Sequence, residues 1–233
     1  MNPERWKARE RARELARQSL SKGDALGWFE QLYREAGSDP ARIPWADDDG
    51  HPLLLTWLAS APRPRPGARA LVVGCGLGED ARALAAAGWT VTAFDISPTA
   101  VEWCRRLAPP SAVPASPAAP VAYVQADLLV APESWRRGFE LVLECYTLQA
   151  LPAALRPQAA SALASFVAPR GSLLVITRLR EPDEPAGELP WPLVRAEVEA
   201  LGALGLVQRE WSEFQSGPSE PRSRHARARY EAS

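Results

Sequence analysis

The chain has 233 residues, 46% of them hydrophobic and 24% charged, a composition that fits one globular domain with an extension better than two full domains. Its 27 lysine and arginine residues nearly balance 28 aspartate and glutamate residues, so the net charge of -1 gives no general attraction to nucleic acid or to an anionic membrane. No apolar run reaches the length of a membrane span and the start lacks the apolar core of a signal peptide, so we expect a cytoplasmic protein.

Residues 1–62 are predicted to form an N-terminal helical cap. Apolar residues recur there at helical spacing between polar loops, which predicts three helices, over residues 3–20, 24–37 and 52–59. The proline-rich stretch 62–67 is a stiff connector. We therefore place a domain boundary at this stretch, with residues 63–233 as the second unit.

The second unit alternates between strands and helices. Short apolar runs predict strands over residues 70–73, 90–94, 121–124, 139–144 and 173–177. Helices are expected between and after them, over residues 80–87, 98–107, 153–167 and 193–204, with a proline-rich loop at 109–120. This alternation predicts an α/β fold in which a mostly parallel sheet carries helices on both faces. Two final strands, 206–214 and 224–230, follow each other without a helix and predict an antiparallel end to the sheet.

A glycine loop follows the first of these strands, with the sequence Gly-x-Gly-x-Gly over Gly74, Cys75, Gly76, Leu77 and Gly78. Glycines at a strand-to-helix turn let backbone N–H groups approach a ligand at the positive end of the helix. The third glycine of the dinucleotide pattern is replaced by Glu79, whose charge would repel a pyrophosphate. The loop therefore favours a cofactor with a cationic or zwitterionic end.

Two carboxylates follow the next two strands. Asp95 ends the second strand, where a carboxylate can accept hydrogen bonds from both hydroxyls of a ribose. Asp127 follows the third strand and can accept from an exocyclic adenine amine, with Ile96 and Leu128 on the two sides of the ring. We therefore expect a nucleoside-containing ligand.

The chain offers few ligands for a metal ion. Its cysteines, Cys75, Cys104 and Cys145, include no two at the spacing of a zinc site, and His51 and His225 are its only histidines. We therefore expect no bound metal.

The glycine loop, Asp95 and Asp127 together resemble the successive motifs of class I S-adenosylmethionine-dependent methyltransferases. The resemblance implies a Rossmann-like, seven-stranded sheet whose last strand is antiparallel. It further implies that S-adenosylmethionine is the cofactor and S-adenosylhomocysteine the product. The methionine part would lie on the loop at Gly74, Cys75, Gly76 and Gly78, the ribose at Asp95, and the adenine at Asp127 and Leu128.

The N-terminal segment is similar to that of the thiopurine, thiol and halide methyltransferase group, through the pairs Gly27-Trp28, Pro44-Trp45 and Pro52-Leu53. The resemblance implies a cap over the cofactor, with Trp28 and Trp45 beside the cofactor and Trp45 also bordering the acceptor. Where that group continues Pro-Trp with Asp, this chain has Ala46.

The acceptor side is expected after the fourth strand, because ligands collect at the carboxyl ends of such sheets. We expect Glu144 to reach the amino group of the cofactor, and Tyr146, Gln149 and Trp191 to face the methyl acceptor. Tyr146 and His51 are the candidates for a catalytic role.

His225 lies among arginines, so we interpret it as part of a charged strand surface, with binding of an anionic acceptor as the alternative.

We therefore expect methyl transfer to a small molecule, first of all to the sulfur of a thiol, by a monomer or weak dimer. An O- or N-methyltransferase of a small aromatic compound is the alternative within this chemistry. A nicotinamide-dependent oxidoreductase is the alternative from another class, although Glu79 opposes it, and a non-catalytic binding module is a further one.

Overall fold

The computed structural model describes residues 3–47, 49–107, 120–215 and 223–233. Its helices are α1 (Pro3–Ser21), α2 (Gly27–Ala36), α3 (Pro52–Ser60), α4 (Glu79–Ala86), α5 (Pro98–Leu107), α6 (Arg156–Phe166) and α7 (Arg195–Glu199). Its strands are β1 (Arg69–Val73), β2 (Thr90–Asp95), β3 (Ala122–Gln125), β4 (Phe139–Cys145), β5 (Val167–Leu179), β6 (Leu206–Gln215) and β7 (Arg224–Ala232). None of the helices that the structure describes is long and apolar enough to cross a lipid bilayer.

The strands of the described residues form one seven-stranded sheet in the order β3-β2-β1-β4-β5-β7-β6. Strands β1 to β5 pair in parallel, whereas β7 runs antiparallel to both of its neighbours. The predicted fold class is therefore confirmed, including the antiparallel end of the sheet. Because β7 runs backwards, its first residues lie beside the last residues of β5 at the carboxyl edge of the parallel strands.

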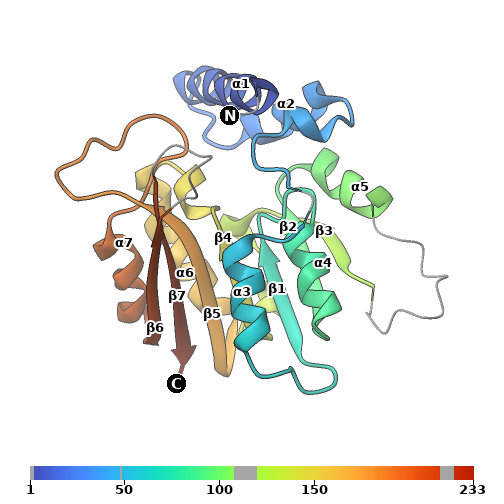
Figure 1. The fold of residues 1–233 in the computed structure, drawn as a ribbon, viewed down its shortest axis with the longest axis vertical. Coiled ribbons are helices and arrows are strands. Elements are labelled where there is room, and N and C mark those ends of the chain that lie inside the picture. The colour runs from blue at the N-terminus through green and yellow to red at the C-terminus, as the bar shows by residue number, and fades with distance from the viewer. Residues whose placement is uncertain (1–2, 48, 108–119, 216–222) are drawn as a thin grey trace.

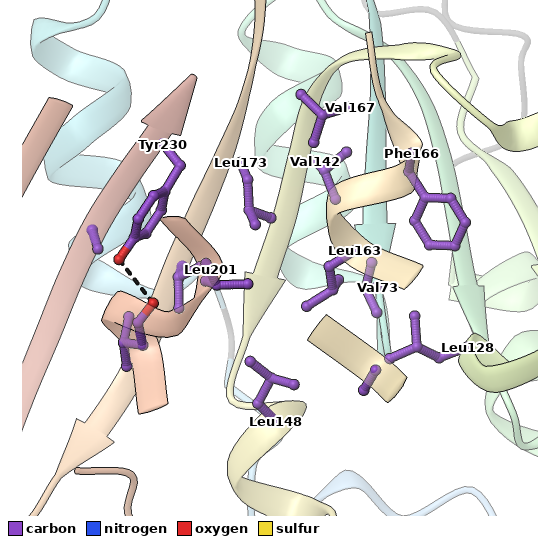
Figure 2. Packing of buried hydrophobic residues seen from close by; sticks show 14 of the residues in the cluster. Val73, Leu128, Val142, Leu148, Leu163, Phe166, Val167, Leu173, Leu201 and Tyr230 are labelled. Atoms are coloured by element: carbon purple, nitrogen blue, oxygen red, sulfur yellow. Dashed lines mark hydrogen bonds between the residues drawn. The ribbon is translucent and has the colours of Figure 1, made fainter. Parts of the chain in front are cut away.

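Helices cover both faces of this sheet, because the strands are apolar on both sides. On one face α6 packs on the sheet through Leu163 and Phe166, and the 3-10 helix after α7 packs through Leu201. The hydroxyl of Tyr230 in β7 donates to the carbonyl of Val198 in α7, 2.9 Å away (Figure 2). On the other face lie α3, α4 and α5.

The cap is formed by α1 and α2, which lie beyond the carboxyl ends of the parallel strands (Figure 1). Small and apolar residues of α1, including Leu15, are buried against Trp28, Leu32 and Tyr33 of α2. Helix α3 differs, because its Leu54 belongs to the apolar cluster of the sheet rather than to that of the cap. The division of the chain at residue 62 stays a prediction.

Some element boundaries differ from those predicted. The helix expected over residues 193–204 is α-helical only in α7 and continues as a 3-10 helix over Ala200–Leu204, a stretch that contains a glycine. Strand β5 is much longer than the predicted 173–177, because it begins at Val167 opposite Phe139 and passes through an irregularity before its regular pairing with β4. Most of the predicted loop at 109–120 falls outside the described residues.

Candidate active site

One cavity of about 840 Å³ opens at the carboxyl edge of the sheet, below α1 and α2. This volume lies in the upper part of the range for small-molecule sites. Most of the site residues predicted from the sequence line it, namely Trp28, Trp45, His51, Gly74, Cys75, Gly76, Asp95, Ile96, Asp127, Leu128, Tyr146 and Gln149. Gly78, Glu144 and Trp191 do not line it.

The glycine loop lies at the end of β1, and its backbone conformation explains its glycines. Gly74 and Gly76 have φ of 58° and 56°, in the left-handed region that other residues seldom adopt. A Cβ on Gly74 would lie 2.5 Å from Oγ1 of Thr147, so the loop packs directly against the turn after β4. A Cβ on Gly78 would lie 2.6 Å from the Tyr123 hydroxyl, which is why Gly78 serves the packing of the loop rather than the cavity.

Asp95 ties the end of β2 to this loop. Its Oδ2 accepts from the backbone N–H of Gly76 at 3.0 Å, and its Oδ1 accepts from that of Ser97 at 2.9 Å. Burial raises the pKa of Asp95 to about 6, although these two hydrogen bonds favour the charged form. The carboxylate is thus held in one orientation, and a carboxylate oxygen has room for a second donor.

Asp127 lies beside Asp95, because the backbone N–H of Ala126 donates to the carbonyl of Asp95 at 3.0 Å. Its Oδ1 accepts from the backbone N–H of Leu129 at 2.8 Å, which begins a short 3-10 helix with Leu128. Both carboxylates therefore stand at neighbouring strand ends, as the sequence predicts.

Four aromatic side chains of the cap form the wall above the glycine loop. The Trp45 indole N–H donates to the hydroxyl of Tyr33 at 2.8 Å, and Trp28 stacks on Phe29 with ring centroids 3.8 Å apart. A Cβ on Gly76 would lie 3.4 Å from the Tyr33 hydroxyl, so the loop approaches this wall closely. The indole Nε1 of Trp28 is buried and has no hydrogen-bond partner within the described chain. We call the part of the cavity bounded by this wall, the glycine loop, Asp95 and Asp127 the glycine-loop half.

The other part of the cavity lies over the ends of β4, β5 and β6 and the start of β7. Tyr146 follows β4, and its hydroxyl lies 3.0 Å from Nε2 of His51 and 2.6 Å from Nδ1 of His225. Arg178 and Phe214 flank His225 on the neighbouring strands. We call these five residues the histidine half.

The position of His225 corrects the prediction of a charged strand surface, because the side chain is buried and lines the cavity. Its ring Nε2 lies 2.8 Å from Oγ of Ser223.

His51 precedes α3, and its Nδ1 accepts from the backbone N–H of Leu53 at 3.2 Å. Its own backbone N–H donates to Oδ1 of Asp80 at 2.6 Å. Burial, together with the nearby His225, lowers the pKa of His51 to about 4, so its imidazole is neutral at neutral pH.

Glu144 lies behind the cavity wall, where the sequence placed it beside the cofactor. Its side chain is fully buried, and its Oε1 accepts from the backbone N–H groups of Thr147 at 2.7 Å and Leu148 at 2.9 Å. Burial raises the pKa of Glu144 to about 7. The carboxyl group thus holds the turn in which Tyr146 adopts a φ of 63°.

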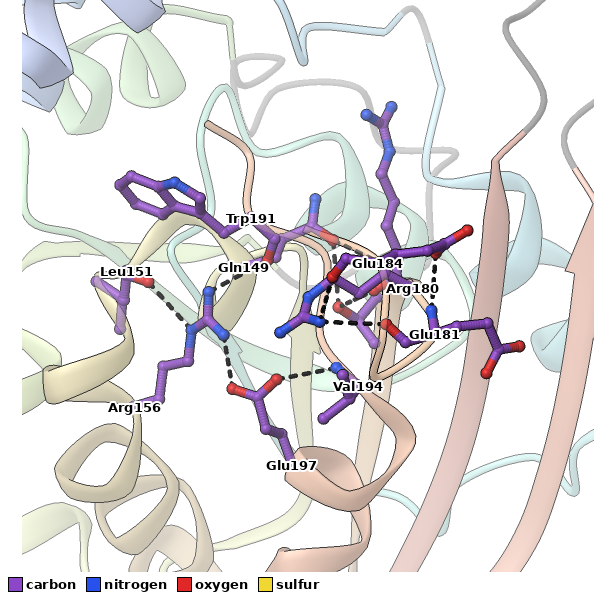
Figure 3. A network of polar contacts seen from close by, with 11 residues as sticks. Gln149, Leu151, Arg156, Arg180, Glu181, Glu184, Trp191, Val194 and Glu197 are labelled. Carbon is purple, nitrogen blue, oxygen red and sulfur yellow. Dashed lines mark hydrogen bonds and ion pairs between the residues drawn. The ribbon is translucent and has the colours of Figure 1, made fainter. Parts of the chain in front are cut away.

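Gln149 and Trp191 are also used in packing. Gln149 lines the cavity, but its Oε1 accepts from the backbone N–H of Arg178 at 2.7 Å, and its carbonyl accepts from that of Trp191 at 2.8 Å. Arg156 fixes the same segment through Glu197, at 2.6 Å, and the carbonyl of Trp191, at 3.2 Å (Figure 3). Trp191 is therefore not brought to the acceptor side.

Sequence reasoning missed Thr147, Arg178 and Phe214 and misplaced His225. A signal for His225 was present, because an antiparallel last strand begins at the carboxyl edge where ligands bind. Arg178 and Phe214 carry no such local signal, since only the strand register brings them beside His225. No group of three or more potential metal ligands is gathered anywhere in the part of the chain that the structure describes.

Comparison with solved structures shows the same fold at low sequence identity. A magnesium protoporphyrin IX methyltransferase from Synechocystis PCC 6803, crystallised with S-adenosylmethionine, is 18% identical with a TM-score of 0.64, over 88% of this chain and 95% of the other. The N-methyltransferase NodS from Bradyrhizobium japonicum, in complex with S-adenosylhomocysteine, is 19% identical with a TM-score of 0.63, over 88% and 97%. A [4+2]-cyclase, SpnF, is 17% identical with a TM-score of 0.67, over 88% and 94%.

Comparison with curated protein sequences finds no match. The family model for thiopurine S-methyltransferase, however, matches residues 35–229, which is most of the chain. With this match and neighbours crystallised with the cofactor or its product, the protein is an S-adenosylmethionine-dependent methyltransferase that acts on small molecules. The chain belongs to the thiopurine S-methyltransferase family.

Proposed function

We propose that the enzyme transfers the methyl group to the sulfur of a small-molecule thiol, with the cofactor in the glycine-loop half and the thiol in the histidine half. The observation that carries this proposal is one cavity with two chemically different halves. They meet where the glycine loop touches Thr147, the neighbour of Tyr146.

The glycine-loop half fits S-adenosylmethionine in each of its parts. Asp95 would accept the ribose hydroxyls, and Asp127 with Ile96 and Leu128 would hold the adenine. The unpartnered indole N–H of Trp28 is a buried donor that the methionine carboxylate would satisfy. When bound there, the cofactor supplies an electrophilic methyl group on a sulfonium, a cation that aromatic faces stabilise by about 0.5–2 kcal/mol.

The same residues fit a nicotinamide dinucleotide poorly. Glu79 and Asp80 begin the helix after the loop and line the cavity. A diphosphate bound at the start of this helix would therefore lie beside two carboxyl groups. The oxidoreductase alternative therefore has no support.

A thiol suits the histidine half because apolar side chains lie beside its tyrosine and its two imidazoles. Leu53 and Phe214 border it, and Tyr146, the neighbour of Thr147 in sequence, supplies a hydroxyl group. A thiolate is a strong soft nucleophile, so holding it about 3–3.5 Å from the methyl carbon provides much of the acceleration. A phenol or an amine is the competing acceptor.

A matched acceptor series tests this proposal. Benzenethiol, phenol, aniline and iodide are each offered with S-adenosylmethionine, and formation of S-adenosylhomocysteine is measured. We expect the highest kcat/KM for the thiol. A higher kcat/KM for phenol or aniline would overturn the choice of sulfur, and binding of S-adenosylhomocysteine without transfer to any acceptor in a broader panel would favour a binding module.

A second test addresses the cofactor contact of Trp28. We expect Trp28→Phe to weaken the binding of S-adenosylhomocysteine by about 1.5–3 kcal/mol, the value of one hydrogen bond to a charged group. Methylthioadenosine lacks the amino acid part, so its affinity should fall less. Calorimetry with both ligands measures the difference. Equal losses for the two ligands would contradict this contact.

We further propose that the enzyme works as a monomer or weak dimer in the cytoplasm. Sedimentation velocity at micromolar concentration tests the oligomeric state.

A further inference from the structure

We infer that Tyr146 and His225 act together as the group that takes the proton from the acceptor's nucleophile. The acceptor is accordingly one that enters the site protonated, such as an alkyl thiol, rather than an anion that needs no base. This inference rests on the proposed function and assigns part of its chemistry to two residues of the histidine half.

The first step of the argument is the tautomer of His51. Its Nδ1 accepts from the backbone N–H of Leu53, so a neutral ring carries its proton on Nε2. That Nε2 lies 3.0 Å from the Tyr146 oxygen and therefore donates to it. Burial keeps the imidazole neutral, since it lowers the pKa of His51 to about 4.

The second step follows from the single proton of the Tyr146 hydroxyl. Because the hydroxyl accepts from His51, its own proton points to Nδ1 of His225, 2.6 Å away. A His225 ring that accepts at Nδ1 carries its proton on Nε2 and donates to Oγ of Ser223, 2.8 Å away. The hydrogen bonds thus run in one direction, from His51 through Tyr146 to His225, and leave Nδ1 of His225 as the basic atom.

The backbone at Tyr146 supports a functional role. A φ of 63° places a bulky residue in the left-handed region, which costs about 1–3 kcal/mol, and strained residues of this kind are enriched at active sites. The turn is held in this conformation from behind, since Glu144 accepts from the N–H of Thr147 and Thr147 donates to the carbonyl of Val73 at 3.0 Å.

The guanidinium of Arg178 lies over the ring of Tyr146, with its Cζ 5.7 Å from the ring centroid. Arg178 lines the cavity and forms no ion pair with any residue that the structure describes. A cation in this position favours negative charge on the phenol oxygen while a proton passes through it.

The proton and the electrons balance in a single concerted step. The acceptor's lone pair forms the new bond to the methyl carbon, and the electrons of the broken carbon–sulfur bond stay on the sulfur of the product. The acceptor's proton passes to the Tyr146 oxygen as the Tyr146 proton passes to Nδ1 of His225. The positive charge of the sulfonium therefore ends on the imidazolium of His225, which later releases the proton to water.

Two thiols of different acidity separate this role from a structural one. 4-Nitrobenzenethiol is already a thiolate at neutral pH, whereas 2-phenylethanethiol is protonated. We expect Tyr146→Phe and His225→Asn to lower kcat/KM for the alkyl thiol by about 100-fold or more, the usual contribution of a general base, and for the aryl thiol by less than about 5-fold. His225→Asn keeps an acceptor toward Tyr146 but is not a base.

Tyr230→Phe is the matched control, because Tyr230 is buried, does not line the cavity and donates its hydroxyl proton to the carbonyl of Val198. We expect this variant to change kcat/KM by the same factor for both thiols. If Tyr146→Phe and His225→Asn lower kcat/KM equally for both thiols, or lower it for neither, the inference is overturned.

Nitrogen NMR tests the inference without turnover. The chain contains only two histidines, so single variants assign every imidazole signal. We expect both rings to be unprotonated at Nδ1 and protonated at Nε2 in the protein loaded with S-adenosylhomocysteine, and Tyr146→Phe to shift the Nδ1 signal of His225. A protonated Nδ1 on His225 would overturn the inference. If the wild-type enzyme methylates no thiol, the proposed function fails by that result, and the NMR result still decides the direction of the hydrogen bonds.

Discussion

The two halves of the cavity are built in different ways. In the glycine-loop half, backbone N–H groups and carboxylates lie at the ends of three adjacent strands, β1, β2 and β3, which also follow each other in sequence, and the aromatic wall comes from residues 28–45. The histidine half is assembled from four distant segments, and Tyr146 and His225 are 79 residues apart in sequence. Local sequence motifs therefore mark the ligand-facing loop and carboxylates of the first half, whereas the second half forms only when strands β4, β5, β7 and β6 have paired.

The charges of the two halves differ as well. Carboxylates such as Asp95 and Asp127 border the glycine-loop half, where a cationic cofactor would be favoured. The histidine half contains Arg178 and two imidazoles. A methyl donor that carries a positive charge would thus be favoured in one half, and a methyl acceptor with negative charge in the other. Variants in the two halves should therefore affect different steps.

The largest effect is expected at the contact between the halves. Gly74→Ala places a Cβ 2.5 Å from Thr147 in a left-handed backbone, so strain and overpacking should together cost about 3 kcal/mol. Calorimetry should show S-adenosylhomocysteine binding weakened by about 100-fold. Adding Thr147→Ala removes the clash but not the backbone strain, and should restore part of the affinity. Unchanged affinity in Gly74→Ala would mean that the loop does not hold the cofactor.

A smaller effect, confined to the glycine-loop half, is expected for Asp95→Ala. Loss of the hydrogen-bond acceptor for two ribose hydroxyls should weaken the binding of S-adenosylhomocysteine by about 2 kcal/mol. Since the hydroxyls donate to the ionised carboxylate and the pKa of Asp95 is about 6, wild-type affinity should also fall as the pH drops from 7 to 5. The variant should lack the part of this pH dependence that Asp95 causes. An affinity that does not change in the variant would refute the assignment.

Glu144→Gln separates a structural carboxyl group from a cofactor ligand. The folded-state pKa of Glu144, about 7, lies above its ordinary value of 4.5, so its contribution to stability is complete below pH 4.5 and is lost as the pH rises through 7. Glutamine stays neutral, so the variant should be more stable than wild type by about 3 kcal/mol at pH 8 and similar at pH 4.5. Urea unfolding at the two pH values measures this. Weaker S-adenosylhomocysteine binding at both pH values would instead restore the predicted contact with the cofactor.

The smallest effect is expected for Arg178→Met in the histidine half. Removing the cation from the ring of Tyr146 should raise the activation barrier for 2-phenylethanethiol by about 0.5–1 kcal/mol and so lower kcat/KM a few-fold. Binding of S-adenosylhomocysteine should not change. Arg180→Met is the matched control, because Arg180 lies two residues along the chain and does not line the cavity. A loss of cofactor affinity in Arg178→Met would show that the two halves are not independent.

The contrast between the halves also explains what the sequence could predict. The sheet, the glycine loop, Asp95 and Asp127 depend on periodicity and on residues close in sequence, and the structure brings these site residues together as expected. The direction of the side chains after β4 depends on the left-handed turn at Tyr146. A tyrosine in the sequence gives no indication of such a turn. Glu144 therefore turned out to lie behind the wall, and Gln149 and Trp191 to serve packing.

His225 illustrates a second limit. Among arginines in an extended segment it has the pattern of a solvated strand, and only the pairing of β7 with both β5 and β6 buries it. Periodicity describes a strand by itself, whereas burial here depends on which strands become its neighbours.

The reversed course of β7 has a consequence for how specificity can change. The terminal hairpin delivers His225 and Phe214 to the pocket but contributes nothing to the residues at the ends of β1, β2 and β3. Grafting this hairpin from another member of the family would therefore change the part of the acceptor site that Phe214 and His225 form, while the cofactor side is left unaltered. The hairpin is thus the natural segment for redesigning this enzyme toward new acceptors.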